Sequence, residues 1–186
     1  MAIYTKTGDK GETKVFDKKT GKLTKISKTS CKIASIGAVD ELNSFLGVVR
    51  AELQSYRGAE LQRETERKIL EIQGNLFTIN SILAGGKLRF SKVKTKKLEK
   101  EIDKWEGKLP VLKNFIYYGG SADSSLIFYA RALCRRAERS LVSMHDSSFM
   151  IPDSILIYMN RLSDYLFMLA RARNFELGGK EKAWRR

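Results

Sequence analysis

The sequence predicts an all-α protein, a bundle of about five helices preceded by a loop-rich arm. Three observations predict this class. Only two prolines occur in 186 residues and 42% of the residues are hydrophobic, which is typical of a folded, largely helical domain. Apolar residues recur at steps of three and four along most of the chain. Glycine pairs interrupt this pattern where helices are expected to end.

The sequence predicts that residues 1–36 form an irregular arm, with a short hairpin at most. Gly8, Gly11 and Gly21 punctuate a segment rich in lysine, aspartate and threonine, and such segments form loops and turns. The stretch IYTKTGDKGETK contains neither G-x-x-x-x-G-K-[ST] nor a complete G-x-G-x-x-G. The two common glycine-rich nucleotide motifs are therefore excluded here.

Residues 37–175 predict the helical bundle. A first helix carries apolar residues at i, i+3, i+4 and i+7, and further helices are expected at residues 58–84, 92–107, 121–145 and 153–175. Pro110 and Gly119-Gly120 frame a loop before the fourth helix, and residues 176–186 form a basic tail. The whole chain, 1–186, is expected to be one domain. The expected buried seams comprise Leu42, Phe45, Leu46 and Val49; Ile69, Ile72, Leu76, Ile79 and Leu83; Leu126, Ala130, Leu133, Ala137 and Leu141; and Ile155, Met159, Leu162, Leu166 and Leu169.

Composition narrows the class of function. The net charge is +14, and its lysines leave three interpretations open: a nucleic-acid partner, a polyphosphate ligand or a solvated surface. No apolar run approaches the ~20 residues of a membrane span, and no apolar signal core begins the chain. Cys31 and Cys134 form neither a zinc spacing nor a disulfide framework, so a reducing cytoplasm is expected. His145 is the only histidine, which argues against a His-based metal site or a Ser-His triad.

Two segments carry charged residues at helical spacing. In ARALCRRAERSL, Arg131, Arg135 and Arg139 are four apart and share one face. This face is either a solvated basic stripe or a binding face for phosphate oxygens, which guanidinium groups contact in pairs. In YMNRLSDYLFMLAR, Asn160, Asp164 and Arg171 fall near one face. This face either binds a ligand or forms a hydrogen bond inside the bundle.

The pair Asp40 and Glu41 follows SIGAV near the expected start of the first helix. Negative charge stabilises a helix N-terminus. Position alone therefore favours a capping role for these two residues.

Five motifs occur together and in order: YTKTGDKGET, GAVDELNSFLG, LPVLKNFIYYGGS, ARALCRRAERSLV and MNRLSDYLFMLAR. With them the chain resembles the PduO-type ATP:cob(I)alamin adenosyltransferases, or corrinoid adenosyltransferases, from Ile3 to about Arg173. The resemblance implies a transferase that moves the 5′-deoxyadenosyl group of ATP to cobalt and releases triphosphate. It also implies a five-helix, ferritin-like up-down bundle that assembles as a homotrimer, with active sites between adjacent subunits.

The resemblance also assigns residues. Hydroxyls, lysines and backbone N–H groups around a glycine turn suit a polyanion without a Walker motif. Asp40 and Arg131 match a salt bridge between subunits. The expected corrinoid-binding residues are Phe115, which matches an aromatic residue beneath the corrin, and Tyr118, which stands in the same loop where the family usually has proline. Lys14 stands where small hydroxyl residues are common. The positions that match ATP contacts are Thr5, Lys6, Thr7, Gly8, Thr13, Lys14, Lys28, Arg135, Arg136, Glu138, Arg139 and Asn160.

The implied chemistry is a displacement at the ribose 5′ carbon by cob(I)alamin, which needs no general base. Arg135 and Arg139, with Lys6, Lys28 and Mg²⁺ carried by ATP, would neutralise the leaving triphosphate. Phe115 would occupy the lower side of the corrin and exclude the axial ligand, which makes Co(II) easier to reduce. No metal ligand from the protein is assigned.

The implied partners are a flavin-type reductase and an adenosylcobalamin-dependent acceptor enzyme, with neither a membrane nor a specific nucleic acid. Two other interpretations stay open. One is a catalytically inactive ATP-binding trimer, in which Tyr118 in place of the usual proline would accompany the loss of catalysis. The other is a basic helical nucleic-acid-binding protein, which the lysine-rich segment Lys87–Lys104 favours.

Overall fold

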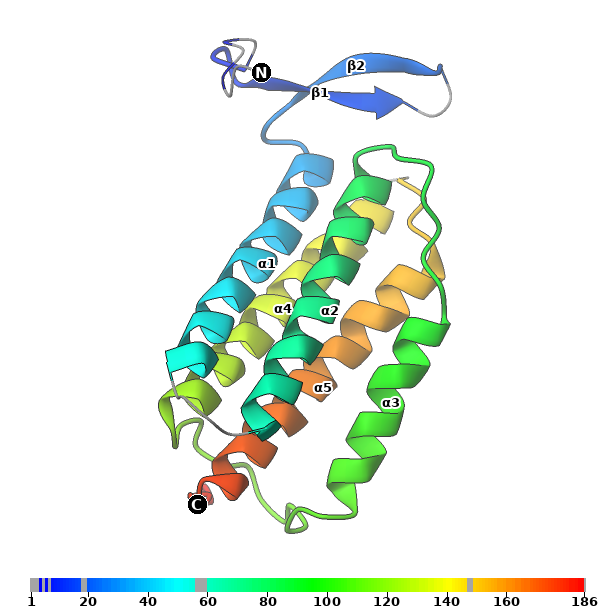
Figure 1. The fold of residues 1–186 in the computed structure, drawn as a ribbon. Helices are drawn as coiled ribbons and strands as arrows, with labels where there is room; N and C mark the ends of the chain where they lie inside the picture. The colour runs from blue at the N-terminus through cyan, green and yellow to red at the C-terminus, as the bar shows by residue number, and fades with distance from the viewer. Residues whose placement is uncertain are drawn as a thin grey trace.

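The chain folds as five helices with a two-stranded hairpin at one end (Figure 1). The computed structural model describes residues 4, 6, 8–17, 20–55, 60–146 and 149–185. Successive helices run in opposite directions along the bundle (Figure 1). The elements are β1 (Glu12–Asp17), β2 (Lys22–Ser27), α1 (Cys31–Ser55), α2 (Glu60–Leu83), α3 (Val93–Glu106), α4 (Ala122–Asp146) and α5 (Asp153–Glu176).

The predicted apolar seams form the core. Every seam residue is buried except Phe45 and Leu126, which are half-buried and pack against the core. α4 packs against α1 and α5, α2 packs against α1, and α3 packs against α5. Ala130, Cys134 and Ala137 are fully buried on α4, and these small side chains allow neighbouring helices to approach closely. The prediction of a five-helix bundle is confirmed.

α1 begins at Cys31, earlier than the predicted boundary at residue 37. The cause is Ser30, whose hydroxyl accepts a hydrogen bond from the N–H of Ile33 at 3.4 Å while its carbonyl accepts the N–H of Ala34 at 2.9 Å. Serine is a favoured N-cap residue because its oxygen satisfies a free N–H of the first turn. The capping role for Asp40 and Glu41 is therefore wrong: both lie inside α1.

The predicted hairpin exists and is attached to the bundle. β1 and β2 pair antiparallel, with Glu12 opposite Ser27 and Asp17 opposite Lys22. At the far end of α2, the N–H of Phe16 donates to the carbonyl of Ala84 at 3.1 Å. Gly85 follows with φ +103°, and a Cβ at this position would lie 2.1 Å from the carbonyl oxygen of Phe16. A glycine is therefore required where the hairpin meets α2.

Two further expectations concern chemistry and location. Cys31 and Cys134 are both free thiols, which agrees with the absence of a disulfide framework. Within the part of the chain that the structure describes, no helix has the length and apolar character needed to cross a membrane.

We expect Gly85→Ala to loosen the hairpin from the bundle. The new methyl group meets the backbone of β1, and alanine is strained at positive φ, so the cost exceeds about 1 kcal/mol. Amide hydrogen exchange at Phe16 measures this loosening directly. Gly178→Ala is the matched control, because Gly178 has φ +74° and nothing within 4 Å of an added Cβ. Equal protection of the Phe16 amide in both variants would contradict the prediction.

Candidate functional site

A compact turn brings two predicted nucleotide positions of the arm together. Lys28 donates from Nζ to the carbonyl of Gly8 at 2.9 Å, and its backbone N–H donates to the carbonyl of Gly11 at 2.9 Å. Lys6 has φ +57° and is the one non-glycine residue with positive φ among the residues described. Thr5 and Thr7 lie outside the described residues. The turn therefore holds the Lys28 ammonium against the carbonyl of Gly8 at the glycine turn of the arm.

The strand that follows separates two other predicted positions. Thr13 and Lys14 are neighbours in β1, where successive side chains point to opposite faces of the hairpin. Thr13 is half-buried and Lys14 is exposed. The structure therefore does not bring both side chains to one face.

The arginines of α4 differ in their partners. Arg136 forms an ion pair with Glu41 of α1, and both side chains are about half exposed. Arg135 and Arg139 are exposed, and neither makes a hydrogen bond or an ion pair with any residue that the structure describes. The ion pair with Glu41 involves Arg136, which is not one of the three arginines of the predicted stripe. Arg135 and Arg139 keep their full donor sets available for a ligand.

Asn160 joins α5 to the same face. Its Nδ2 donates to Oε1 of Glu138 at 2.8 Å, so the two predicted ATP contacts lie side by side. The other members of the predicted polar face do not join them. Asp164 accepts from Arg161 on its own helix at 2.8 Å, and Arg171 is buried.

Arg131 is placed by aromatic rings. Its Nη1 donates to the hydroxyl of Tyr118 at 3.2 Å, and its guanidinium lies over the rings of Tyr118 and Phe167 at 5.6 and 5.4 Å. Tyr118 in turn stacks on Phe128, with ring centroids 4.9 Å apart. Asp40 is exposed on α1 and forms no ion pair with Arg131 within one chain, among the residues described. Tyr118 therefore fixes the loop end against α4.

Phe115 is presented to solvent. Its side chain is 82% exposed, so it does not anchor the loop in the core. Val111, Tyr117 and Tyr118 of the same segment are also exposed, at 83%, 55% and 58%. Exposed apolar side chains concentrated in one loop are typical of a binding surface.

The tail holds this loop, which sequence reasoning missed. The N–H of Trp184 donates to the carbonyl of Phe115 at 2.7 Å, and the N–H of Tyr117 donates to the carbonyl of Lys182 at 2.9 Å. Ile116 and Ala183 form an antiparallel bridge between these bonds. The only signal in the sequence was a tryptophan in an otherwise polar tail.

Arg171 of α5 secures the base of this pairing. It contacts both carboxylate oxygens of Glu181 at 2.6 and 3.1 Å and donates to the carbonyl of Pro110 at 2.7 Å. Its side chain is 4% exposed. Arg171 is therefore a structural residue that connects the loop, the tail and α5.

The predicted residues lie along the length of the molecule. The hairpin extends beyond the start of α1, whereas the segment between α3 and α4 lies at the other end of the bundle with the C-terminus (Figure 1). α4 runs between the two ends, with Arg131 nearer the loop and Arg139 nearer the hairpin. Eight residues of helix separate these arginines by about 12 Å. One chain alone therefore does not gather the arm and the Phe115 loop into one compact site.

A cysteine thiol lies beneath this face of α4, and its burial prevents it from acting as a nucleophile. Cys134 is fully buried and its thiol donates to the carbonyl of Met159 at 3.4 Å. Burial in the bundle raises the pKa of this thiol far above its ordinary value. Cys134 therefore stays protonated and does not serve as a nucleophile.

Comparisons with known proteins agree on one family. The family model for cobalamin adenosyltransferase matches residues 3–173. A corrinoid adenosyltransferase of Bacillus subtilis is 39% identical over 96% of this chain and 89% of its own, and a cobalamin adenosyltransferase of Cupriavidus metallidurans is 34% identical over 99% and 94%. Among solved structures, a variant PduO-type ATP:corrinoid adenosyltransferase from Lactobacillus reuteri, complexed with cobalamin and ATP, has a TM-score of 0.86 and 32% identity, with full coverage of both chains.

Proposed function

This chain belongs to the cobalamin adenosyltransferase family, and we propose that it transfers the 5′-deoxyadenosyl group of ATP to the cobalt of cob(I)alamin or a related corrinoid. The products are adenosylcobalamin and triphosphate. The observation that carries the proposal is that Arg135 and Arg139, on the exposed face of α4 beside the Asn160–Glu138 pair, have no partner among the residues described. A solved relative that holds both ATP and cobalamin supports it.

The reaction requires alignment and charge stabilisation. Cob(I)alamin attacks the 5′ carbon of the ribose, the C5′–O bond breaks, and its electron pair leaves with the triphosphate. No proton needs to be removed, and this suits a face whose side chains are arginines, an asparagine and one carboxylate. Arg135 and Arg139 would bind the triphosphate oxygens and stabilise the charge that grows on them.

The arm would complete the nucleotide site. Lys6 and Lys28 would supply ammonium groups, and the bond from Lys28 to the carbonyl of Gly8 keeps that turn closed. Lys28 would therefore act partly through the turn and partly through its own charge.

Mg²⁺ would reach this site with the nucleotide. Among the residues described, no group of three or more His, Cys, Asp or Glu side chains is placed to hold a metal ion. The described side chains therefore do not form a metal site of their own, and we assign no step to Mg²⁺. Phosphate oxygens of ATP are the ligands that it ordinarily takes.

The loop end would face the corrin. Phe115 projects an apolar ring that cannot coordinate cobalt, and its backbone is fixed by the tail. A ring in this position would keep an axial base from the lower side of the corrin. Cobalt would then become easier to reduce, because axial ligation controls the metal potential. The stacked Tyr118 supports the loop in the absence of the usual proline.

We also propose a homotrimer of ferritin-like bundles, with each site formed between subunits. The arm and the Phe115 loop lie at opposite ends of one chain, so a neighbouring subunit is needed to bring them together. Asp40 and Arg131 are available to each other across such an interface. Exposed apolar side chains on α1 and α4, namely Val48, Tyr129 and Val142 at 50%, 54% and 44%, favour association through these helices.

The place of the enzyme in metabolism follows from its chemistry. A flavin-type reductase would supply the electron that converts Co(II) to Co(I), and an adenosylcobalamin-dependent enzyme would accept the product. Anaerobic incubation of the chain with ATP and chemically reduced cobalamin, followed by visible spectroscopy, tests the activity. An adenosylcobalamin spectrum is expected. ATP binding without any corrinoid turnover would instead favour the inactive ATP-binding trimer.

We expect Arg135→Ala to lose a close charge contact to the triphosphate, at a cost of about 2–5 kcal/mol. Arg135→Lys should also be impaired, because an ammonium group cannot reproduce the guanidinium fork. Steady-state kinetics would measure both variants, with Arg89→Ala as a control that removes an exposed arginine elsewhere. Unchanged kcat and KM for ATP in Arg135→Ala would refute the assignment.

Asp40→Ala tests the assembly. If Asp40 is buried against Arg131 of a neighbour, its loss costs about 3–5 kcal/mol per pair, and the trimer should dissociate at higher protein concentrations than the parent. Multi-angle light scattering across a dilution series gives the mass. Asp103→Ala, on the exposed face of α3, is the matched control. A parent protein that is an active monomer would contradict the trimer.

Phe115→His tests control of the axial ligand. The variant should bind ATP normally but fail with cob(II)alamin and a mild reductant, because imidazole can coordinate cobalt or admit a base. It should retain much more activity with cob(I)alamin that has been reduced beforehand. Phe115→Leu, which keeps an apolar side chain, is the conservative control. Electron paramagnetic resonance distinguishes four- from five-coordinate Co(II), and a four-coordinate signal that persists in Phe115→His would count against this role.

A further inference from the structure

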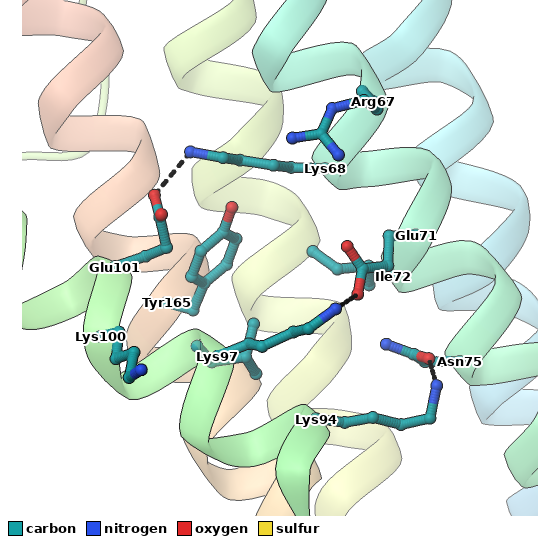
Figure 2. Close-up of a pocket in the computed structure, with 11 residues that line it drawn as sticks. Arg67, Lys68, Glu71, Ile72, Asn75, Lys94, Lys97, Lys100, Glu101 and Tyr165 are labelled. Atoms are coloured by element: carbon teal, nitrogen blue, oxygen red, sulfur yellow. Dashed lines mark hydrogen bonds and ion pairs between the residues drawn. The ribbon is translucent and has the colours of Figure 1, made fainter.

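A basic cavity lies on the other side of the bundle, in the groove between α2 and α3. Its volume is about 280 Å³, close to the lower end of the roughly 300–1,000 Å³ of ligand pockets. Tyr165 of α5 lies at its floor (Figure 2). The candidate site described above uses α4 and the two ends of the molecule, and α3 packs on α5 rather than on α4. The cavity therefore lies apart from that site.

Cations dominate the lining. Two carboxylates, Glu71 and Glu101, are also present, so the lining carries an excess of three positive charges. The five cations come from two helices: Arg67 and Lys68 from α2, and Lys94, Lys97 and Lys100 from α3. The side chains of Lys68, Lys94 and Lys97 reach across the groove between these helices (Figure 2).

Each carboxylate already has a lysine. Lys68 contacts Glu101 at 2.5 Å, and Lys97 contacts Glu71 at 2.8 Å. Burial opposes the charge of Lys68, but hydrogen bonds to Glu101 and Glu64 outweigh it and raise the pKa of the lysine. The hydrogen bond from Lys97 lowers the pKa of Glu71. Lys68 also contacts Glu64, at 2.9 Å, so this one lysine is shared between two carboxylates, whereas Lys97 and Glu71 balance each other.

The other three cations have no carboxylate in contact among the residues described. Lys94 donates to the amide oxygen of Asn75, which is neutral, and lies over the ring of Phe90. Arg67 and Lys100 make no hydrogen bond or ion pair with the residues that the structure describes. These three side chains carry the positive charge that exceeds the two carboxylates of the lining, and Glu64 beside Lys68 reduces that excess to two. A concave basic surface focuses the electrostatic potential on an anion inside it.

Two polar groups deeper in the cavity, a hydroxyl and an amide, have fixed positions for directional hydrogen bonds. Tyr165 is 1% exposed, yet its hydroxyl has no hydrogen-bond partner within the described part of the chain and points toward Lys68 (Figure 2). The hydroxyl oxygen is not one of the fully buried side-chain atoms that lack a partner, so it is open to the cavity. Burial also raises the pKa of Tyr165, so the group stays protonated and can donate. Asn75 is held by Tyr158 at 3.1 Å and gives the site a fixed amide.

We propose that this cavity binds a compact multivalent phosphate, of the inorganic polyphosphate or nucleotide-phosphate class. Arg67 supplies a guanidinium fork for phosphate oxygens, Lys94 and Lys100 supply point charges, and the hydroxyl of Tyr165 donates from the floor. The small volume favours a short phosphate chain over an extended polymer. The proposal is independent of the adenosyl transfer.

Trp105 gives a local signal for the test. Its ring lies 5.2 Å from the ring of Tyr165 and 5.7 Å from the ammonium of Lys68. The chain has two tryptophans, so Trp184→Phe leaves Trp105 as the only source of indole fluorescence. Sodium tripolyphosphate is titrated into this protein at constant ionic strength. A saturable change in fluorescence is expected, and the same fluorescence throughout the titration would overturn the proposal.

Paired variants locate the binding. In the Trp184→Phe background, Arg67→Ala with Lys100→Ala removes two charge-assisted contacts and should weaken binding at least about tenfold. Arg63→Ala with Lys96→Ala is the matched control: it removes the same charges from exposed positions of α2 and α3 outside the cavity. The control should change the affinity less than about twofold. If both double variants weakened tripolyphosphate binding equally, the loss would follow from the lower net charge alone, and the proposed site would be refuted.

A further variant and two further titrations distinguish this cavity from the nucleotide site and from a nucleic-acid groove. Arg135→Ala should keep the Trp105 response, because its guanidinium belongs to the α4 face; loss of the response would mean that the signal arises from the nucleotide site, and the proposal would fail. ATP replaces tripolyphosphate in one titration to distinguish a nucleotide from a free phosphate chain. A single-stranded RNA oligomer replaces it in another. A response to RNA alone, lost in the Arg67/Lys100 variant, would overturn the proposal in favour of a nucleic-acid groove.

Discussion

The buried ion pair between Asp123 and Arg173 fixes the start of α4, and most of the functional surface depends on that helix. Arg173 donates from Nε at 2.9 Å and contacts the same carboxylate from Nη2 at 2.8 Å, with side-chain exposures of 3% and 1%. The other carboxylate oxygen of Asp123 accepts the N–H of Ser124 at 2.8 Å. A buried pair of this kind costs about 3–5 kcal/mol when one partner is removed. It sets how α4 is rotated where the chain leaves the Phe115 loop.

The rotation of α4 matters because the helix has two incompatible faces. One face is Ala130, Cys134 and Ala137, all fully buried against neighbouring helices. The other carries Arg135 and Arg139 into solvent. A rotation of a quarter turn would bury guanidinium groups and expose the seam, so the core and the candidate site constrain each other. The bond from Asn160 to Glu138 and the pair of Arg136 with Glu41 attach the exposed face to α5 and α1.

The sequence predicts the bundle well because helical periodicity is a local property. The seams of all four amphipathic helices are visible as steps of three and four, and the structure buries them. The start of α1 was misjudged because Ser30, rather than an acidic pair, provides the cap. Apolar spacing alone gives no exact boundary.

The arrangement of the site was less predictable, because its contacts join residues far apart in the chain. Arg131 and Arg135 look equivalent at i, i+4, yet Arg131 packs on Tyr118 and Phe167, whereas Arg135 has no partner in the part of the chain that the structure describes. Arg171 lies near the same helical stripe as Asn160 but is buried by Glu181 and Pro110. Motif resemblance could indicate the chemistry of Phe115, whereas only the fold reveals that its ring is exposed and its backbone paired with the tail.

That pairing makes residues 182–184 part of the Phe115 loop. Main-chain bonds join residues 115–117 to residues 182–184, and they restrict a segment whose free form would have many conformations. Each bond runs between the loop and the tail, so the loop cannot change its backbone without releasing residues 182–184. The order of this surface loop is thereby set by a segment that follows α5, two helices further along the chain. The loop and the tail therefore become ordered together or open together.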